Sequence, residues 1–313
     1  NALRQQKLLA RISPSSIGGF LEPAKVTALS DATLAACDGD DGAVDGVISN
    51  HLGCRFDAAD LRCGTTAAAS APACLNDDDI AFIQTVHSQA PAGYAQVDGI
   101  DQLGPYPIGH EASSWATWLT GEFLGDGYST PYALLLAYEF FPNFITGDAG
   151  TNPLTLDLTA FTAQLARRSA QLDATRADLR AFAAHGGKLI LWHGAADYAV
   201  PLQDTIDYYA RVRIAHPAPG SADIPAADDF VRFYVAPGWT HDYPVAPTLA
   251  ASGPSALIPT LRAWVREGVP PPTQFTLTEV IDTDTGATGT SHWCQYPRYP
   301  RSAPDHSVSC VAP

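Results

Sequence analysis

The chain of 313 residues is long enough to bury a large hydrophobic core, and its length favours two domains. Its composition, 46% hydrophobic and 10% aromatic, is that of a globular protein and not of a disordered chain. The net charge of −15 would repel a nucleic-acid backbone, and no apolar run approaches the ~20 residues of a membrane span. We therefore expect neither nucleic acid nor a membrane among its partners.

The chain begins at Asn1, contains no methionine and shows no apolar signal-peptide stretch at its start. Because translation begins with methionine, we expect an upstream part of the translation product to be missing from this chain. Any targeting segment would lie in that missing part.

The six cysteines form three pairs of near neighbours: Cys37 and Cys54, Cys63 and Cys74, and Cys294 and Cys310. The spacing favours bonds within these pairs, because each pair brackets a loop rich in Gly, Pro or Asp. The alternative is six buried thiols, whereas zinc is not expected, since no His stands at ligand spacing from a cysteine pair. Disulfides would place the protein in an oxidising compartment, secreted or periplasmic.

The first part of the chain predicts helices and loops. Residues 24–36 and the segment after Asn76 carry apolar side chains at helical spacing, and Asn is a favoured helix N-cap. Residues 88–160 contain many aromatic residues among scattered Gly and Pro, which indicates a loop-rich insertion. Residues 160–184 are helical by pattern and end at two glycines, 186–187, suited to a left-handed C-cap.

The pattern then changes to alternating strands and helices. Two apolar runs, 188–193 and 230–235, are typical of strands buried on both faces of a parallel sheet. Each is followed by a loop and a predicted helix, near 203–214 and 254–267, which is the order of an α/β sheet. The remaining residues are rich in Pro, Thr and Asp and end in the last cysteine pair.

A polar residue follows each predicted strand, where active residues of open α/β sheets lie. Asp197 follows the first strand and His241 follows the second. This is the order of α/β-hydrolases, in which the carboxylate orients the imidazole and the imidazole deprotonates a nucleophile. The alternative is a helix-capping Asp197 and a His241 without a chemical role, but the two strand patterns favour the catalytic interpretation.

No Gly-x-Ser-x-Gly nucleophile elbow occurs in the sequence. Ser16, in Ser-Ser-Ile-Gly-Gly, superficially resembles one, but no buried strand precedes it and Pro14 lies two residues before it. All six cysteines have a plausible disulfide partner. We therefore expect neither Ser16 nor a cysteine to be the nucleophile.

A second group of polar residues, Asp38, Asp41 and Asp45, lies at steps of three and four with glycines between them. Carboxylates and carbonyls so arranged suit Ca²⁺, which prefers six to eight oxygen ligands. The loop lacks the Glu at the twelfth position of an EF-hand. The alternative is a solvated acidic turn, but a disulfide between Cys37 and Cys54 would pre-form the loop and favours calcium.

These motifs resemble the tannase/feruloyl esterase family of α/β-hydrolases. Matches of different kinds, namely the acidic loop, the acid motif, the histidine motif and a terminal disulfide, occur along the chain. The residues that carry them are 35–48 with 54–57, 186–197, Pro237-Gly238 before His241, and 293–297 with Cys310.

The resemblance implies a structural Ca²⁺ ion, distant from the chemistry. It implies that Asp38, Asp41 and Asp45 bind this ion through their side chains and that Ala43 and Val47 bind it through their carbonyls.

The resemblance also implies a serine-type carboxylic ester hydrolase acting on aromatic (phenolic) esters, with Asp197 and His241 in its triad. The family's Cys-Ser-x-Gly-Gly nucleophile segment is absent, and Asp242 replaces a cysteine that commonly bridges to it. We therefore expect a separate N-terminal polypeptide to supply the serine, the remaining strands and the oxyanion hole. The alternatives are a non-catalytic, calcium-stabilised secreted binding domain on a degenerate hydrolase scaffold, and a hydrolase of lactones or polyesters.

The predicted fold class is α/β, in three parts. Residues 1–170 form a loop-rich, disulfide-stapled lid domain with the calcium loop. Trp115 and Trp118 are candidates to contact an aromatic acyl group, and ordinary packing within the lid is the equally favoured alternative. Residues 171–275 form the C-terminal part of an α/β-hydrolase core, and residues 276–313 form a disulfide-stapled tail.

Overall fold

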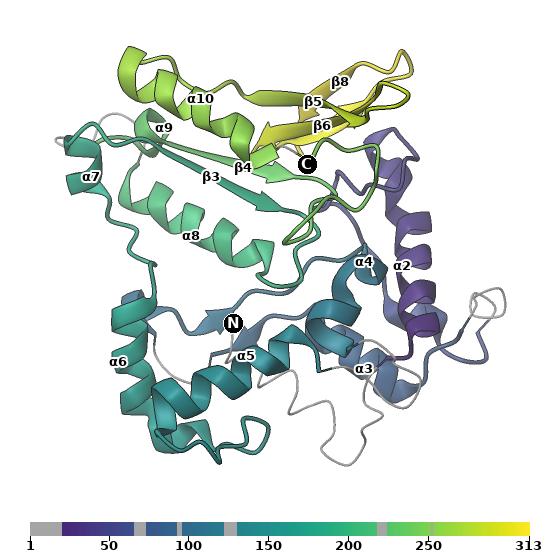
Figure 1. Ribbon diagram of the computed structural model, residues 1–313, viewed down its shortest axis with the longest axis vertical. Helices are drawn as coiled ribbons and strands as arrows, with labels where there is room; N and C mark the ends of the chain where they lie inside the picture. The colour runs from purple at the N-terminus through teal and green to yellow at the C-terminus, as the bar shows by residue number, and fades with distance from the viewer. Residues whose placement is uncertain (1–20, 66–72, 93–95, 122–129, 218–223, 252) are drawn as a thin grey trace.

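A four-stranded sheet with helices on both faces forms the C-terminal half of the chain, and a helical region forms most of the rest (Figure 1). The computed structural model describes residues 21–65, 73–92, 96–121, 130–217, 224–251 and 253–313. Within these ranges no helix is long and apolar enough to cross a membrane. The α-helices are α2 (Pro23–Cys37), α3 (Asp77–Val86), α4 (Glu111–Trp115), α5 (Tyr132–Phe140), α6 (Thr162–Leu172), α7 (Arg180–Ala184), α8 (Leu202–Ala215), α9 (Ala227–Phe230) and α10 (Gly253–Glu267).

Shorter turns and the strands complete the element order. The helical turns are η1 (Asp38–Asp41), η2 (Ala58–Leu61), η4 (Val97–Gly99), η5 (Ala116–Thr120), η6 (Phe141–Thr146) and η7 (Leu158–Phe161). The strands are β1 (Ala90–Pro91), β2 (Gln102–Leu103), β3 (Leu189–Gly194), β4 (Val231–Ala236), β5 (Gln274–Asp282), β6 (Ala287–Gln295), β7 (Tyr299–Ser302) and β8 (Val308–Val311).

The main sheet has the strand order β3-β4-β6-β5. β3 and β4 are parallel, with Leu189 beside Val231 and Gly194 beside Ala236, which confirms the predicted parallel pair. β6 pairs antiparallel with both β4 and β5. Among the described strands nothing pairs with the outer edge of β3.

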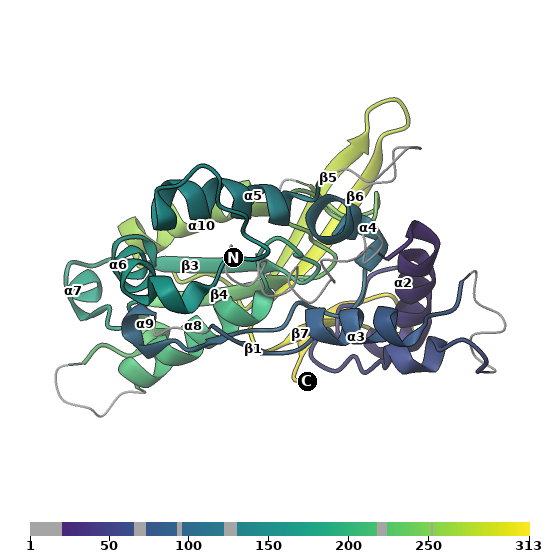
Figure 2. The same ribbon diagram turned by 90° about the horizontal axis from the view of Figure 1, so that it is seen from below.

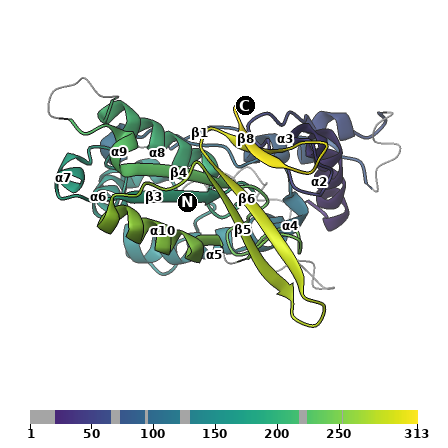
Figure 3. The same cartoon turned by 90° about the horizontal axis from the view of Figure 1, so that it is seen from above.

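The segment after residue 275 is not only a stapled tail, because β5 and β6 extend the same sheet (Figure 3). Phe275 and Leu277 are buried and alternate with exposed residues, which is the two-residue period of a strand. The expected boundary at 275 therefore falls inside β5, and the expected boundary at 170 falls inside α6. The Thr- and Asp-rich composition concealed this alternation.

Alternate side chains of β3 and β4 point into two separate cores. Leu191, Phe233 and Val235 pack against α8, whereas Trp192 and Tyr234 pack with residues of α10 and β6. Figure 1 shows α8 and α10 on opposite sides of the sheet. Because helices cover both faces of the sheet, both strands are nearly continuous runs of apolar residues.

The described part of residues 1–170, which the sequence predicts as a lid and which we call the lid region, packs around Trp115, which is completely buried. Leu29 of α2, Ile83 of α3 and Tyr198 from the sheet's loops belong to the same core. α3 begins with a capping box, since Asn76 and Asp79 each accept a hydrogen bond from the other's backbone N–H, at 2.9 and 2.8 Å. Figure 2 shows α2 and α3 together at one end of the molecule, with α8 and α9 toward the other.

Two helix predictions need correction. The pattern at 160–184 is divided into α6 and α7, because Asp173 leaves the helical conformation (φ −79°, ψ 122°) and no helix resumes before Arg180. The expected left-handed C-cap is confirmed at Gly186, whose φ is 76°. The region 88–160 is less irregular than expected, because it contains α4 and α5.

All three neighbouring cysteine pairs form disulfides: Cys37–Cys54, Cys63–Cys74 and Cys294–Cys310. The first closes the acidic loop at the end of α2, and the third joins β6 to β8. In the chain-entropy account, each disulfide that closes a loop of 11 to 17 residues stabilises the fold by about 3 kcal/mol.

The loops after β3 and β4 lie against each other. The N–H groups of Ala195 and Ala196 donate to the carbonyls of Ala236 and Trp239, each at 2.9 Å. A Cβ on Gly194 would lie well inside van der Waals contact of the Trp239 carbonyl. Only glycine permits this approach of the two backbones.

We predict that Gly194→Ala destabilises the fold by about 1–3 kcal/mol, because the new methyl group must push the two loops apart. Urea denaturation measures this loss. Gly39→Ala is the matched control, since its Cβ would meet only Val44, at 3.7 Å, and its free energy of unfolding should change by less than about 0.5 kcal/mol. Equal stability of the two variants would contradict the account of the close approach.

Candidate active site

The loop after β3 holds the Asp197 carboxylate in one orientation. Asp197 Oδ1 accepts hydrogen bonds from the backbone N–H groups of Ala199 and Val200, at 2.8 and 2.9 Å. Only 8% of the side chain is exposed. Because backbone donors hold Oδ1, the second oxygen is available to the neighbouring loop.

A sharp turn after β4 carries His241. Gly238 adopts a left-handed φ of 64°, which lets the chain turn at the end of the strand. The Thr240 hydroxyl donates to the Tyr243 carbonyl at 2.7 Å and closes the turn. The Tyr243 hydroxyl donates to the Ser113 carbonyl of α4 at 2.8 Å, so the turn is also tied to the lid region.

Asp197 and His241 meet at the carboxyl ends of the two parallel strands. His241 Nδ1 lies 3.1 Å from Asp197 Oδ2, a hydrogen bond in which the imidazole N–H donates. The His241 side chain is 42% exposed. The carboxylate therefore fixes the ring with Nε2, its other nitrogen, directed away from Asp197, as in a catalytic acid–histidine pair.

A second histidine, His193, supports the carboxylate. His193 Nε2 lies 3.5 Å from Asp197 Oδ2 and 2.9 Å from the Val200 carbonyl, to which it donates. Its Nδ1 pairs with the Thr205 hydroxyl at 2.7 Å. Burial alone would raise the pKa of Asp197, but hydrogen bonds from His193, the Val200 N–H and His241 outweigh it and lower the pKa, so the carboxylate is ionised at neutral pH.

The sequence analysis assigned no role to His193. The sequence does contain an indication of such a role, because His193 lies at the end of a buried strand, four residues before Asp197. A histidine at the end of an apolar strand is more often part of the core, and only the contact with Asp197 distinguishes the two cases.

Of the two lid tryptophans, only Trp118 reaches the pair. Its ring packs edge-on against His241, with centroids 5.2 Å apart, and it also contacts Tyr132, at 5.5 Å. Trp115 is completely buried in the lid core, so of the two interpretations ordinary packing holds for it.

No described hydroxyl forms a hydrogen bond with His241, whose partner in the structure is Asp197. Ser16 lies outside the described residues, and all six cysteines are in disulfides. The pair is therefore an oriented base without a nucleophile among the described residues.

The acidic loop folds its carboxylates onto its own backbone. Asp38 accepts hydrogen bonds from the N–H groups of Gly46 and Val47, at 3.0 and 3.2 Å, and Asp41 accepts from Ala43 and Ser49. Asp45 accepts from Val47 at 3.0 Å. Within the described ranges, no three or more His, Cys, Asp or Glu side chains come together as a metal site.

Negative charge dominates the electrostatics of this loop. Burial raises the pKa of Asp41 and of Asp45, and the neighbouring carboxylates add to the effect. Burial lowers the pKa of His110, whose Nε2 accepts from the Ile48 N–H, to about 4, so His110 brings no positive charge at neutral pH. The loop itself contains no Lys or Arg between residues 38 and 49.

Comparison with known proteins identifies the family. The chain matches the family described as "Tannase and feruloyl esterase" over residues 3–312. It is 29% identical over 282 residues to an uncharacterized esterase of Xanthomonas campestris pv. campestris, covering 80% of this chain and 47% of that protein. It is 27% identical over 291 residues to a probable feruloyl esterase B-1 of Aspergillus terreus, covering 89% and 51%.

The fold is similar to the crystal structure of feruloyl esterase B from Aspergillus oryzae, with a TM-score of 0.75 and 20% identity. That match covers 99% of this chain and 61% of the solved chain. The chain thus spans about half the length of the curated relatives it matches. With the family match extending over nearly the whole sequence, the chain belongs to the tannase and feruloyl esterase family.

Proposed function

We propose that this chain supplies the acid and the base of a serine-type carboxylic ester hydrolase that acts on aromatic, phenolic esters. The observation that carries the proposal is the hydrogen bond of 3.1 Å between Asp197 and His241 at the ends of adjacent parallel strands. Family membership supports ester hydrolysis. Relatives named feruloyl esterases support an aromatic acid as the acyl group.

In this mechanism His241 Nε2 removes the proton from a serine hydroxyl as its oxygen attacks the ester carbonyl carbon. Asp197 stabilises the resulting imidazolium through Nδ1. His241 then donates that proton to the departing alcohol oxygen, which leaves an acyl-serine. A water molecule, deprotonated by the same nitrogen, attacks the acyl carbon, releases the acid and restores the serine.

The serine, the oxyanion hole and the remaining strands would come from a separate N-terminal polypeptide of the same enzyme. Two observations support this part. Nothing among the described strands pairs with the outer edge of β3, although Leu189 to Trp192 of that strand are apolar and only half-buried. The curated relatives are also about twice as long as their match to this chain.

Trp118 would form one wall of the substrate site. Its ring contacts both His241 and Tyr132, so an acyl group held beside His241 would meet aromatic surface. Offset or edge-on packing against such rings favours planar aromatic groups.

We further propose that the acidic loop binds a structural Ca²⁺ ion through Asp38, Asp41 and Asp45, with the carbonyls of Ala43 and Val47. The support is the donor chemistry, namely oxygen atoms only, together with the buried carboxylates of Asp38 and Asp41. Calcium would stabilise the end of α2 and take no part in the reaction. The three disulfides support a secreted or periplasmic location.

We predict that Asp197→Asn lowers kcat for methyl ferulate by about 10⁴-fold with little change in KM, because the imidazole loses its orienting acceptor. His241→Ala should lower kcat at least as much. Steady-state kinetics of the intact enzyme measure both effects. The matched control is His185→Ala, since His185 is exposed and bonds only to its own helix. Full activity of the His241→Ala enzyme would contradict the catalytic role.

A fluorophosphonate probe tests the source of the nucleophile. We expect it to label a serine on a second polypeptide that co-purifies with this chain, and the label to be lost in the His241→Ala enzyme. Mass spectrometry of the labelled peptides identifies the site. Labelling within these 313 residues, or ester hydrolysis by this chain alone, would contradict the proposed division of the active site.

Calcium binding predicts a stability difference that depends on one carboxylate. Adding Ca²⁺ at about 100 times its Kd to chelator-treated protein should stabilise the fold by about 2.7 kcal/mol, measured as a rise in Tm. Asp41→Asn should abolish the rise. Asp40→Asn, a neutralised exposed neighbour in the same loop, should retain it. An equal rise in both variants, or none in the unmodified protein, would contradict the calcium site.

A further inference from the structure

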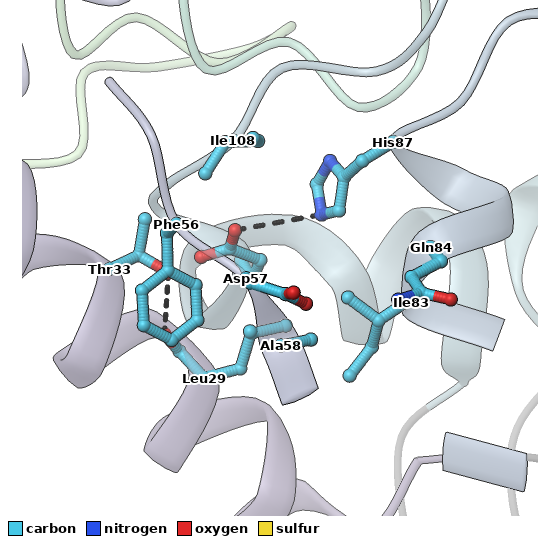
Figure 4. A pocket seen from close by; sticks show the side chains of 10 residues that line it. Leu29, Thr33, Phe56, Asp57, Ala58, Ile83, Gln84, His87 and Ile108 are labelled. Atoms are coloured by element: carbon cyan, nitrogen blue, oxygen red, sulfur yellow. Dashed lines mark hydrogen bonds and ion pairs between the residues drawn. The ribbon is translucent and has the colours of Figure 1, made fainter. Parts of the chain in front are cut away.

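A cavity of about 260 Å³ lies in the lid region, between α2, η2, α3 and the start of α4. Figure 4 shows Phe56, Ile83 and His87 around it. Gln84 and Asp57, at its rim, are exposed and mark its opening to solvent. None of these residues belongs to the Asp197–His241 pair or to the acidic loop.

The cavity is apolar on most of its wall and polar at one end. Leu29, Ile83, Phe56 and Ile108 provide the apolar wall. At the polar end the carboxyl of Glu111 is completely buried, and only 10% of the His87 side chain is exposed. An apolar cavity with a few convergent polar groups is the usual form of a small-molecule site.

Two acceptor atoms at this end have no hydrogen-bond partner. Glu111 Oε1 accepts from the Gly109 N–H at 2.7 Å, but Oε2 is unpartnered. His87 Nδ1 lies 3.3 Å from the Tyr106 carbonyl, which can only accept, so Nδ1 carries the proton and the unpartnered Nε2 is an acceptor. The 3.8 Å between His87 Nε2 and Glu111 Oε1 is too long for a hydrogen bond.

The neighbouring groups do not satisfy these acceptors. The Tyr198 hydroxyl is close to the Glu111 carboxyl, but its single proton is shared between the carbonyls of Pro107 and Gly109, each 2.9 Å from the hydroxyl oxygen. Burial lowers the pKa of His87 to about 4 and raises that of Glu111 to about 7. The imidazole is therefore neutral at pH 7, and the site carries at most one negative charge.

We propose that this cavity binds a small phenol, whose ring lies against the apolar wall and whose hydroxyl donates a hydrogen bond to Glu111 Oε2 or His87 Nε2. When Glu111 is ionised, at a pH above its pKa of about 7, both free atoms are acceptors, so the ligand must supply the donor. A ring is favoured because the wall is apolar and includes Phe56. Water alone fits less well, since the cavity has room for several water molecules and only one end offers them hydrogen-bond partners.

The test compares ligands of similar size on the intact enzyme by isothermal titration calorimetry at pH 8.5, where Glu111 is ionised. We expect 4-methylphenol to bind with a Kd of roughly 0.1–1 mM, a strength ordinary for so few atoms. We expect 4-methylanisole and toluene, which lack the donor, to bind at least tenfold more weakly. Equal binding of all three would overturn the hydrogen-bonding role, and binding of benzylamine more tightly than the phenol would assign the site to cations instead.

Three variants locate the site independently of ester hydrolysis. Glu111→Gln keeps an acceptor for the Gly109 N–H and replaces Oε2 by a donor, so phenol binding should weaken at least tenfold. Ala58→Leu fills the cavity and leaves the polar pair intact, so it should remove binding even if Glu111→Gln fails to fold. Gln84→Ala, at the exposed rim, is the control and should bind normally. Unchanged binding in the Ala58→Leu enzyme would overturn the proposal.

Discussion

The parallel pairing of β3 with β4 is the constraint on which the site depends. In register, Gly194 lies beside Ala236, so the loops that follow begin at the same level. The hydrogen bonds of Ala195 and Ala196 then bring the two loops into contact. Asp197 and His241 are 44 residues apart in sequence, yet this arrangement places His241 Nδ1 3.1 Å from Asp197 Oδ2.

The surroundings of the pair keep it rigid. Backbone N–H groups and His193 hold the carboxylate, and the turn around Thr240 holds the imidazole. Tyr198, next to Asp197, belongs to the core of the lid region and donates to carbonyls of that region, so the loop after β3 and the lid region share one packed interior. The His87 ring packs against Trp115 and Tyr198 of this interior, with ring centroids 5.8 and 6.4 Å apart.

Much of this arrangement could be predicted from the sequence. The two buried strands produce continuous apolar runs, and the polar residues that follow them identify Asp197 and His241. The disulfides follow from the spacing of the cysteines. These features involve residues that are near in sequence or that follow strands ending at the same edge of the sheet. The sequence pattern is therefore enough to predict them.

Other features depend on tertiary contacts that no local pattern records. α5 is apolar around most of its circumference, so periodicity gave no signal for it. The strands β5 and β6 were concealed by their Thr-rich composition. His87 and Glu111, 24 residues apart, form a site only because α3 and α4 pack against the same core. The role of His193 likewise depends on its distance from Asp197.

The central claim is that Asp197 fixes His241 in the tautomer of a catalytic base. Nitrogen-15 NMR of the imidazole in the intact enzyme measures this directly. We predict that neutral His241 carries its proton on Nδ1, with a strongly downfield proton resonance that disappears in Asp197→Ala. A proton on Nε2, or a resonance unchanged by that substitution, would contradict the account.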